Sequence, residues 1–283
     1  MALVGAHMPT QGRPEKALHL GAQIGCEIVQ LFVKNPRQWR GQSLDWQIVD
    51  YFLKARSAYS FPLIVAHAGY LINLASPDPD VARQSFCAAA DEVSRCLSLG
   101  IDAIVFHPGA HSGSGATAAI AQFRRQLTKI VDIVQDHPML VLIENSAGQG
   151  TSIGHRLEEL AQIIEGFSEE RVGLCLDTAH LYAAGYDISR AEGRNLLANE
   201  IERTVGWSRL RLLHFNDTLK GLGSRVDRHW HIGDGNIGGD GFSFFLHHPR
   251  FRLVPGVIET PQAPFRHPVN LRRLKELRDR SVG

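Results

Sequence analysis

Short apolar segments rich in β-branched residues recur along the whole chain, and longer segments with helical spacing separate most of them. Eight such segments are candidate strands: residues 2–7, 27–33, 63–67, 102–107, 139–144, 172–177, 210–215 and 256–259. The helical segments cover residues 14–25, 45–59, 79–99, 116–135, 155–167 and 268–280. Strands that alternate with helices form parallel sheets, and nearly continuous apolar strands are buried on both faces. The pattern therefore predicts an α/β fold with a covered parallel sheet.

The number of strand–helix units favours a closed barrel over an open, doubly wound sheet. A (β/α)₈ barrel typically takes about 250 residues, and this chain has 283. No repeat, low-complexity segment or long linker suggests a second domain. We therefore predict a single-domain TIM barrel that spans residues 1–283 and carries the catalytic site.

The composition excludes several classes of protein. Hydrophobic residues make up 44% of the chain, and no apolar run approaches a membrane span or resembles a signal peptide, so we expect a cytoplasmic protein without a membrane partner. The four cysteines have no C-x-x-C spacing, and we expect reduced, buried thiols at Cys26, Cys87, Cys96 and Cys175. Because the net charge is only +1, a nucleic acid would have to bind to local patches. We expect a monomer.

Potential metal ligands end seven of the eight candidate strands, at the face where TIM barrels carry their active sites. They are His7, His67, His107, Glu144, Asp177, His214 and Glu259, whereas the second strand leads into Lys34 and Asn35. A single ligand-type residue at a strand end is usually only a hydrogen-bonded cap. Seven together would repel one another or stay unpaired without cations between them. The strand ends therefore predict a metal centre.

Two short motifs add ligands to this set. In LDTAH, His180 follows Asp177 by three residues, and in DRH, Asp227 and His229 are two apart, so an extended loop points both the same way. His231 continues this spacing and is either a partner of the ligands or a solvated loop residue. Without His7 and His231, nine donors remain, which suits three sites that each keep an open position. Nitrogen and carboxylate ligands without thiolate fit Zn²⁺, Mn²⁺ or Fe²⁺, and clustered divalent metals are typical of phosphoester hydrolysis.

The segment GDGNIG, residues 233–238, matches the G-x-G-x-x-G template of dinucleotide-binding proteins. That fingerprint has to follow the first strand and open a helix. Here it follows DRHWHI, far along the chain and without a preceding strand. We therefore expect no nucleotide cofactor and interpret the glycines as a sharp turn beneath the metal ligands.

Longer motifs are spread over nearly the whole chain: GAH at 5–7, KNPRQWR at 34–40, HAGYLINLA at 67–75, VFHPGAH at 105–111, LIENSAGQG at 142–150, GLCLDTAH at 173–180, GSRVDRHWHIGDGNIG at 223–238 and VIET at 257–260. Together they resemble the endonuclease IV family of apurinic/apyrimidinic endonucleases. The resemblance implies a TIM barrel with three zinc ions and a hydrolase of base excision repair. Its substrate would be double-stranded DNA, cleaved 5′ to an abasic site.

The resemblance also implies which residues perform the reaction. The zinc ions would be held by His67, His107 and Glu144, by Glu144, Asp177, His214 and Glu259, and by His180, Asp227 and His229, with Mn²⁺ or Fe²⁺ as alternatives at one or more sites. A hydroxide shared by the first two metals would attack the phosphorus, with Glu144 and Glu259 as catalytic carboxylates. The products would be a 3′-hydroxyl and a 5′-deoxyribose phosphate.

DNA contacts are expected from loops beside the metal ligands. The resemblance implies that Arg37, Tyr70 and Leu71 enter the DNA stack at the lesion while the abasic nucleotide flips out, which costs least where a base is missing. Phosphate contacts are expected from the cations of KNPRQWR, among them Lys34, and from the neighbouring Asn35. Arg225 and Arg228, in the loop around the third metal, are expected to contact phosphate as well. The alternative is a solvated loop with Trp39 packed on the barrel, and ion pairs for the arginines at 225 and 228.

Some residues depart from the family pattern without removing a ligand: Pro9, Arg13, Ala179 and Asp234. Two other functions compete with the nuclease. Related barrels that isomerise or epimerise sugars bind one metal through the ligands of strands five to eight, here Glu144, Asp177, His214 and Glu259. A non-catalytic damage-binding protein would keep the fold but has no use for a complete ligand set.

Overall fold

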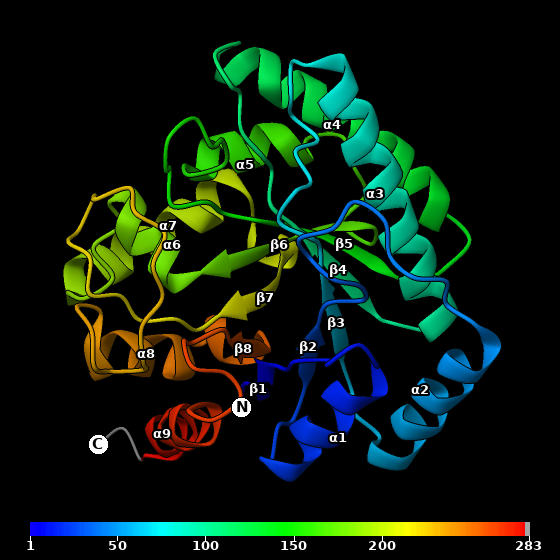
Figure 1. Cartoon of the computed structure of the whole chain (residues 1–283). Coiled ribbons are helices and arrows are strands. Elements are labelled where there is room, and N and C mark those ends of the chain that lie inside the picture. Colours follow the sequence, from blue (N-terminus) through cyan, green and yellow to red (C-terminus); the bar gives the residue numbers. More distant parts are fainter. Residues whose placement is uncertain (281–283) are drawn as a thin grey trace.

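Eight parallel strands form a closed barrel inside a ring of helices in the computed structural model, which describes residues 1–280 (Figure 1). The strands are β1 (Val4–His7), β2 (Val29–Leu31), β3 (Ile64–His67), β4 (Ala103–Phe106), β5 (Leu140–Glu144), β6 (Val172–Asp177), β7 (Leu210–His214) and β8 (Gly256–Ile258). Each strand pairs with the next, and β8 pairs with β1, where Ala6 lies opposite Ile258. The predicted TIM barrel and all eight candidate strands are confirmed.

The helices are α1 (Glu15–Gln23), α2 (Trp46–Tyr59), α3 (Pro79–Leu99), α4 (Ala116–Val134), α5 (Leu157–Ile164), α6 (Thr178–Ala184), α7 (Ala191–Thr204), α8 (Gly238–His247) and α9 (His267–Asp279). The sequence analysis did not predict α6, α7 and α8. Six of the seven residues of α6 are buried, so the helix shows no polar face, and α8 begins with the poor helix formers Gly238 and Gly239. Asp45 and Asp78 cap the starts of α2 and α3, where their side chains accept backbone N–H groups.

The strands separate two apolar layers. Alternate residues of each strand pack outward against the helices, as Ile64 and Ala66 of β3 do. The residues between them fill the barrel interior: Ile28, Val65, Ala103, Val105, Leu142, Cys175, Leu212 and Val257. Because side chains alternate along a strand, the next inward-facing position lies two residues further on, at the carboxyl end of the barrel.

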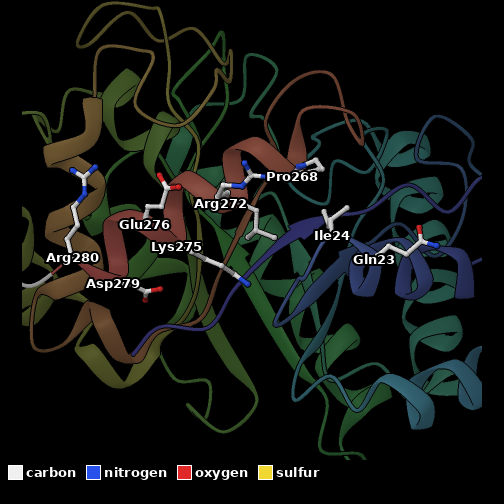
Figure 2. A pocket seen from close by; sticks show the side chains of 9 residues that line it. Gln23, Ile24, Pro268, Arg272, Lys275, Glu276, Asp279 and Arg280 are labelled. Carbon is white, nitrogen blue, oxygen red and sulfur yellow. The ribbon is translucent and has the colours of Figure 1, made fainter.

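The ring of helices closes where α9 meets α1, and a cleft of about 750 Å³ lies between them (Figure 2). Its lining mixes apolar, acidic and basic side chains, such as Leu271, Lys275 and Glu276. Lys275 Nζ donates to the Gly25 carbonyl, and Arg278 pairs with Glu27, so this closure is held by polar contacts. Among the described residues 1–280, no helix is long and apolar enough to cross a membrane.

Candidate metal centre

The predicted strand-end ligands lie directly above the apolar interior of the barrel. Six of the seven, all except His7, follow an interior residue by two positions: Val65 and His67, Val105 and His107, Leu142 and Glu144, Cys175 and Asp177, Leu212 and His214, and Val257 and Glu259. Period-two alternation therefore turns all six side chains inward. Parallel strands end at the same rim, so the side chains converge at one mouth of the barrel.

The same alternation places Gln30, not Lys34 or Asn35, in the ligand layer of β2, because Gln30 follows the interior residue Ile28. Gln30 is fully buried; its Oε1 faces His214 Nε2 at 2.9 Å, and its Nε2 donates to Glu259 Oε1 at 2.6 Å. The sequence analysis missed this residue. A lone polar residue inside the apolar run EIVQLFV, two positions after an inward-facing one, is the signal that would have found it.

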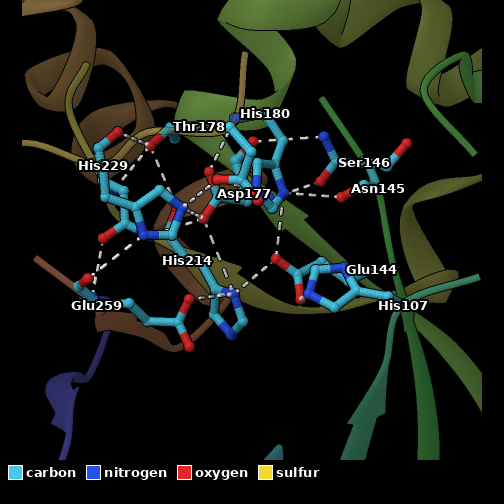
Figure 3. A network of polar contacts seen from close by, with 12 residues as sticks. His107, Glu144, Asn145, Ser146, Asp177, Thr178, His180, His214, His229 and Glu259 are labelled. Atoms are coloured by element: carbon cyan, nitrogen blue, oxygen red, sulfur yellow. Dashed lines mark hydrogen bonds and ion pairs between the residues drawn. The ribbon is translucent and has the colours of Figure 1, made fainter. Parts of the chain in front are cut away.

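Glu144 contacts several histidines of the cluster, and Figure 3 shows it beside His107 and joined to His180 and His214. Its carboxylate is fully buried and lies 3.0 Å from His67 Nε2, 3.8 Å from His107 Nε2 and 3.0 Å from His214 Nδ1. Potential ligand atoms lie within 4.8 Å of one another in two overlapping groups, one with His67, Glu144 and His214 and the other with Glu144, Asp177, His214 and Glu259. Glu144 belongs to both groups, so its two oxygens can serve two ions.

A second cluster lies beside it and is built from Asp177, His180 and His229, whose ligand atoms also lie within 4.8 Å of one another. Asp227 joins it, with Oδ1 at 3.2 Å from His180 Nε2 and 3.6 Å from His229 Nε2. His180 comes from the first turn of α6. Its backbone N–H donates to Asp177 Oδ1, so the Asp177 side chain caps the helix. Asp227 and His229 come from the long loop between β7 and α8.

Four histidines have one ring nitrogen committed to a protein oxygen. Nδ1 faces a backbone carbonyl in His67 (Ala68, 2.8 Å), His180 (Asn145, 2.9 Å) and His229 (Glu259, 3.3 Å), and in His214 it is Nε2 that faces Gln30 Oε1. A carbonyl oxygen can only accept, so each committed nitrogen carries the proton. The other nitrogen of each ring keeps a lone pair that faces the carboxylates, which is the arrangement of metal-binding histidines.

Two of these free nitrogens, His180 Nε2 and His229 Nε2, are buried and have no hydrogen-bond partner among the described residues. A buried polar atom without a partner is costly, so something has to occupy the space it faces. A cation fits, because the neighbouring groups are the carboxylates of Asp177 and Asp227. The donor set of imidazole nitrogens and carboxylate oxygens suits Zn²⁺, Mn²⁺ or Fe²⁺.

The charges of the site depend on one another. Burial raises the pKa of the Glu144 and Glu259 carboxyls, but the neighbouring imidazoles, of which His214 has the largest effect, together outweigh burial and hold both pKa values well below the usual range. Burial lowers the pKa of His180, yet Asp177 and Asp227 raise it well above the ordinary value. The carboxylates therefore stay ionised only with positive charge beside them, which is supplied by protons or by metal ions.

Most predicted DNA-contact residues are exposed on loops around this mouth. Asn35, Arg37, Arg225 and Arg228 are exposed, and so are Tyr70 and Leu71, of which Tyr70 is 60% exposed. The side chains of Tyr70 and Arg228 both line a cavity of about 570 Å³ above the metal ligands and a neighbouring one of about 400 Å³. The larger of the two also contains Glu259 and His229, so it opens onto both clusters.

Lys34 points into the protein, unlike the other predicted DNA contacts. Its side chain is 3% exposed, and Nζ donates to the Trp39 carbonyl at 2.8 Å and lies 3.4 Å from Glu92 Oε1. Glu92 also accepts the Gly69 N–H, and Tyr70 N–H donates to the Pro36 carbonyl. The ammonium group thus joins the loop that carries Arg37 to the loop that carries Tyr70. Trp39 is partly buried against the core, as the alternative interpretation of this loop expected.

The remaining unusual residues lie near the site without blocking it. Pro9 lines the larger cavity, and Ala179 is buried beside His180. Arg13 pairs with Glu15, and Asp234 pairs with Arg273, both through side chains. His231 is buried and contacts Asn270 through Nδ1, so it is not a solvated loop residue.

Comparisons with known proteins agree with this geometry. The family model of the xylose isomerase-like TIM barrel matches residues 18–277. The chain is 42% identical to a protein named probable endonuclease 4 from Geobacter sulfurreducens, over 92% of this chain and 88% of that protein. It is 40% identical to a protein of the same name from Citrifermentans bemidjiense, over 98% and 99% of the two chains.

Solved structures give the same result. The crystal structure of endonuclease IV from Thermus thermophilus superposes with a TM-score of 0.86 at 31% identity, and covers 97% of this chain and 98% of that chain. A D-tagatose 3-epimerase-like protein superposes with a TM-score of 0.69 at 17% identity, which shows a shared fold only.

Proposed function

Because this chain belongs to the endonuclease IV family and is a DNA-cleaving hydrolase, we propose that it is an apurinic/apyrimidinic endonuclease of base excision repair. It hydrolyses the phosphodiester 5′ to an abasic site in double-stranded DNA and leaves a 3′-hydroxyl and a 5′-deoxyribose phosphate. The observation that carries the proposal is the double cluster at the barrel mouth, in which the free nitrogens of four histidines face four carboxylates.

Three divalent ions, with zinc as the first choice, fit this donor set. They would be held by His67, His107 and Glu144, by Glu144, Asp177, His214 and Glu259, and by His180, Asp227 and His229. When bound, these ions supply positive charge around the phosphate and make the attacking water more acidic. Phosphoryl transfer needs little else beyond positioning, so no serine or cysteine nucleophile is required.

The protein residues orient the reactants around this centre. Glu144 is fully buried and fixed between two histidines, whereas the Glu259 side chain is 17% exposed and lines the larger cavity. Glu259 Oε2 is therefore placed to accept a proton from water, while Gln30 holds its other oxygen. Fixing a carboxylate in this way keeps it in the geometry that the reaction requires.

The exposed rim supports recognition of a missing base. Tyr70, Leu71 and Arg37 offer an aromatic, an aliphatic and a cationic side chain from two neighbouring loops, and the cavity of about 570 Å³ beside Tyr70 can receive an extruded nucleotide. Asn35, Arg225 and Arg228 contact phosphates, which positions the duplex without reading its sequence. A missing base weakens stacking and so favours extrusion at the lesion.

The decisive experiment combines incision with metal analysis on one preparation. The protein is incubated with duplex DNA that contains one abasic site, and metal content is measured by mass spectrometry. We expect incision on the 5′ side, inhibition by a chelator and about three ions per chain, since nine donors suit three sites that each keep an open position. A single ion with turnover of sugars would contradict the proposal, as would tight binding without incision at full metal loading.

Arg37→Ala tests the rim separately. The variant should lose affinity for abasic DNA more than for intact duplex, because only the lesion admits its side chain into the stack. Binding is measured on both duplexes, with Arg40→Ala as the control for a general phosphate contact: Arg40 lies in the same loop, and its loss should lower the affinity for both duplexes alike. Equal loss on both duplexes would reduce Arg37 to a general phosphate contact.

A further inference from the structure

Asp217 is a fully buried carboxylate that the chemistry above does not use. It accepts five backbone N–H groups, of which four come from the glycine-rich segment GDGNIG. Oδ1 accepts from Thr218 at 2.8 Å and Ile237 at 3.0 Å, and Oδ2 accepts from Gly233 at 2.9 Å, Gly235 at 3.0 Å and Gly238 at 3.3 Å. Successive backbone N–H groups of this kind form a nest for an anion.

The nest explains why a phosphate-binding template occurs at this point of the chain. Its anion is the side chain of Asp217, so its donors are already used within the protein. The space is closed as well, because a Cβ added at Gly235 would lie 2.4 Å from Asp217 Oδ1 and 2.5 Å from the Thr218 carbonyl oxygen. Gly233 and Gly238 have positive φ, which favours glycine where the backbone wraps around the carboxylate.

The nest lies at the end of the segment that carries Asp227 and His229. Trp230 follows His229 directly, and its N–H donates to the Asp217 carbonyl at 2.6 Å. Further back, the Asp227 N–H donates to Gln149 Oε1 at 3.0 Å. Asp217, which lies just after β7, therefore holds this segment at two points. Its backbone carbonyl accepts from Trp230, and its carboxylate accepts from residues 233–238.

We propose that Asp217 is the positioning residue of the third metal site: it fixes the loop between β7 and α8 so that Asp227 and His229 meet His180. This inference rests on the proposed function, because it assumes that this cluster binds an ion. The other ligands come from strand ends and α6, and the barrel holds them without this loop. Loss of the nest should therefore weaken one metal site out of three.

The test measures metal affinity in the full chain, by titrating the metal-free protein with Zn²⁺ in competition with a chromogenic chelator. In Asp217→Asn, one oxygen that accepts N–H groups becomes an NH₂ donor. We expect one site to lose affinity by about 10- to 100-fold, as for other outer partners of metal ligands, while two sites keep the wild-type affinity. Incision should fall at low zinc concentration and recover when zinc is raised.

Further variants separate positioning from folding. Gly235→Ala crowds the same nest and should weaken the same single site. Gly221→Ala, in the same loop but with no atom near its added Cβ, should match the wild type, as should Asp234→Asn, which removes a carboxylate from the same turn without touching the nest. Wild-type zinc affinity at all three sites in Asp217→Asn would overturn the inference, and so would equal loss at all sites in both nest variants. A wild type that binds three ions but does not incise abasic DNA would contradict the proposed function and leave this zinc titration intact as a test.

Discussion

Four histidines at the barrel mouth each have one ring nitrogen fixed by a neighbouring carbonyl oxygen, on the side of the ring away from the carboxylates. Backbone carbonyls fix the rings of His67, His180 and His229, and Gln30 fixes the ring of His214. The remaining nitrogen of each ring is thereby aimed at the centre before any ion binds. Substitution of one ligand therefore removes a prepared coordination position, not merely a charge.

His229→Ala should abolish most incision while leaving DNA binding largely intact. The imidazole belongs to the second cluster, whose proposed ion would stabilise the charge of the departing 3′ oxygen, and losing one such group costs on the order of 100-fold or more in rate. The check is single-turnover incision together with affinity for abasic DNA. His137→Ala serves as the control, because His137 is exposed in the turn between α4 and β5. Unchanged turnover would remove His229 from the site.

At the scale of elements, a buried ion pair joins the two loops that are expected to enter DNA. Glu92 of α3 lies 3.4 Å from Lys34 Nζ, in the loop after β2, and accepts the Gly69 N–H, in the loop after β3. Burial raises the pKa of Glu92 to about 7. The rim that carries Arg37 and Tyr70 is therefore supported by a carboxyl group that titrates near neutral pH.

Glu92→Gln should change how stability depends on pH. Because the folded-state pKa of about 7 lies above the ordinary value of 4.5, the folded protein binds the proton more tightly. The resulting stabilisation is fully present below about 4.5 and is lost as pH rises through about 7. The free energy of unfolding of the wild type, measured in urea relative to Glu92→Gln, should therefore decrease across this window. The same comparison with Glu165→Gln, an exposed residue, should be flat, and a flat Glu92 comparison would show that this carboxyl titrates normally.

At the scale of the whole molecule, metal ions and protons compete for the same centre. Burial lowers the pKa of His180 and His214, but their acidic neighbours raise it well above the ordinary value, so both rings take up protons when no metal is bound. Metal binding should then release protons. The folded state alone presents the assembled centre, so bound ions stabilise the fold.

Chelation should lower the midpoint of thermal unfolding, and more so at alkaline pH. A ligand at 100 times its Kd adds about 2.7 kcal/mol per site. In the metal-free protein, protonated histidines replace part of that stabilisation below their ordinary pKa, and this is lost as pH rises through the raised values. Calorimetry with and without chelator, followed by added zinc, checks both effects. An unchanged midpoint after verified metal removal would contradict a structural contribution of the ions.

The barrel and its inward-facing ligands were predictable because both depend on local periodicity. Alternation along a strand decides which face a residue takes, and parallel strands end at one rim, so His67, Glu144 and Glu259 could be placed together from their positions alone. The same reasoning had no signal for α6, whose residues are buried on every side, and it overlooked Gln30 because a neutral amide is not a metal ligand.

Only the tertiary structure decided which groups the charged residues of the loops contact. The sequence by itself predicted the fold and the candidate ligands and carried the family resemblance, since these follow from the order and spacing of residues. It did not reveal that Lys34 is turned inward to Glu92, nor that the glycines of GDGNIG surround Asp217. In both cases the partner is far away or lies across a long loop, and the choice between solvent, DNA and protein depends on which groups the fold brings within hydrogen-bonding distance.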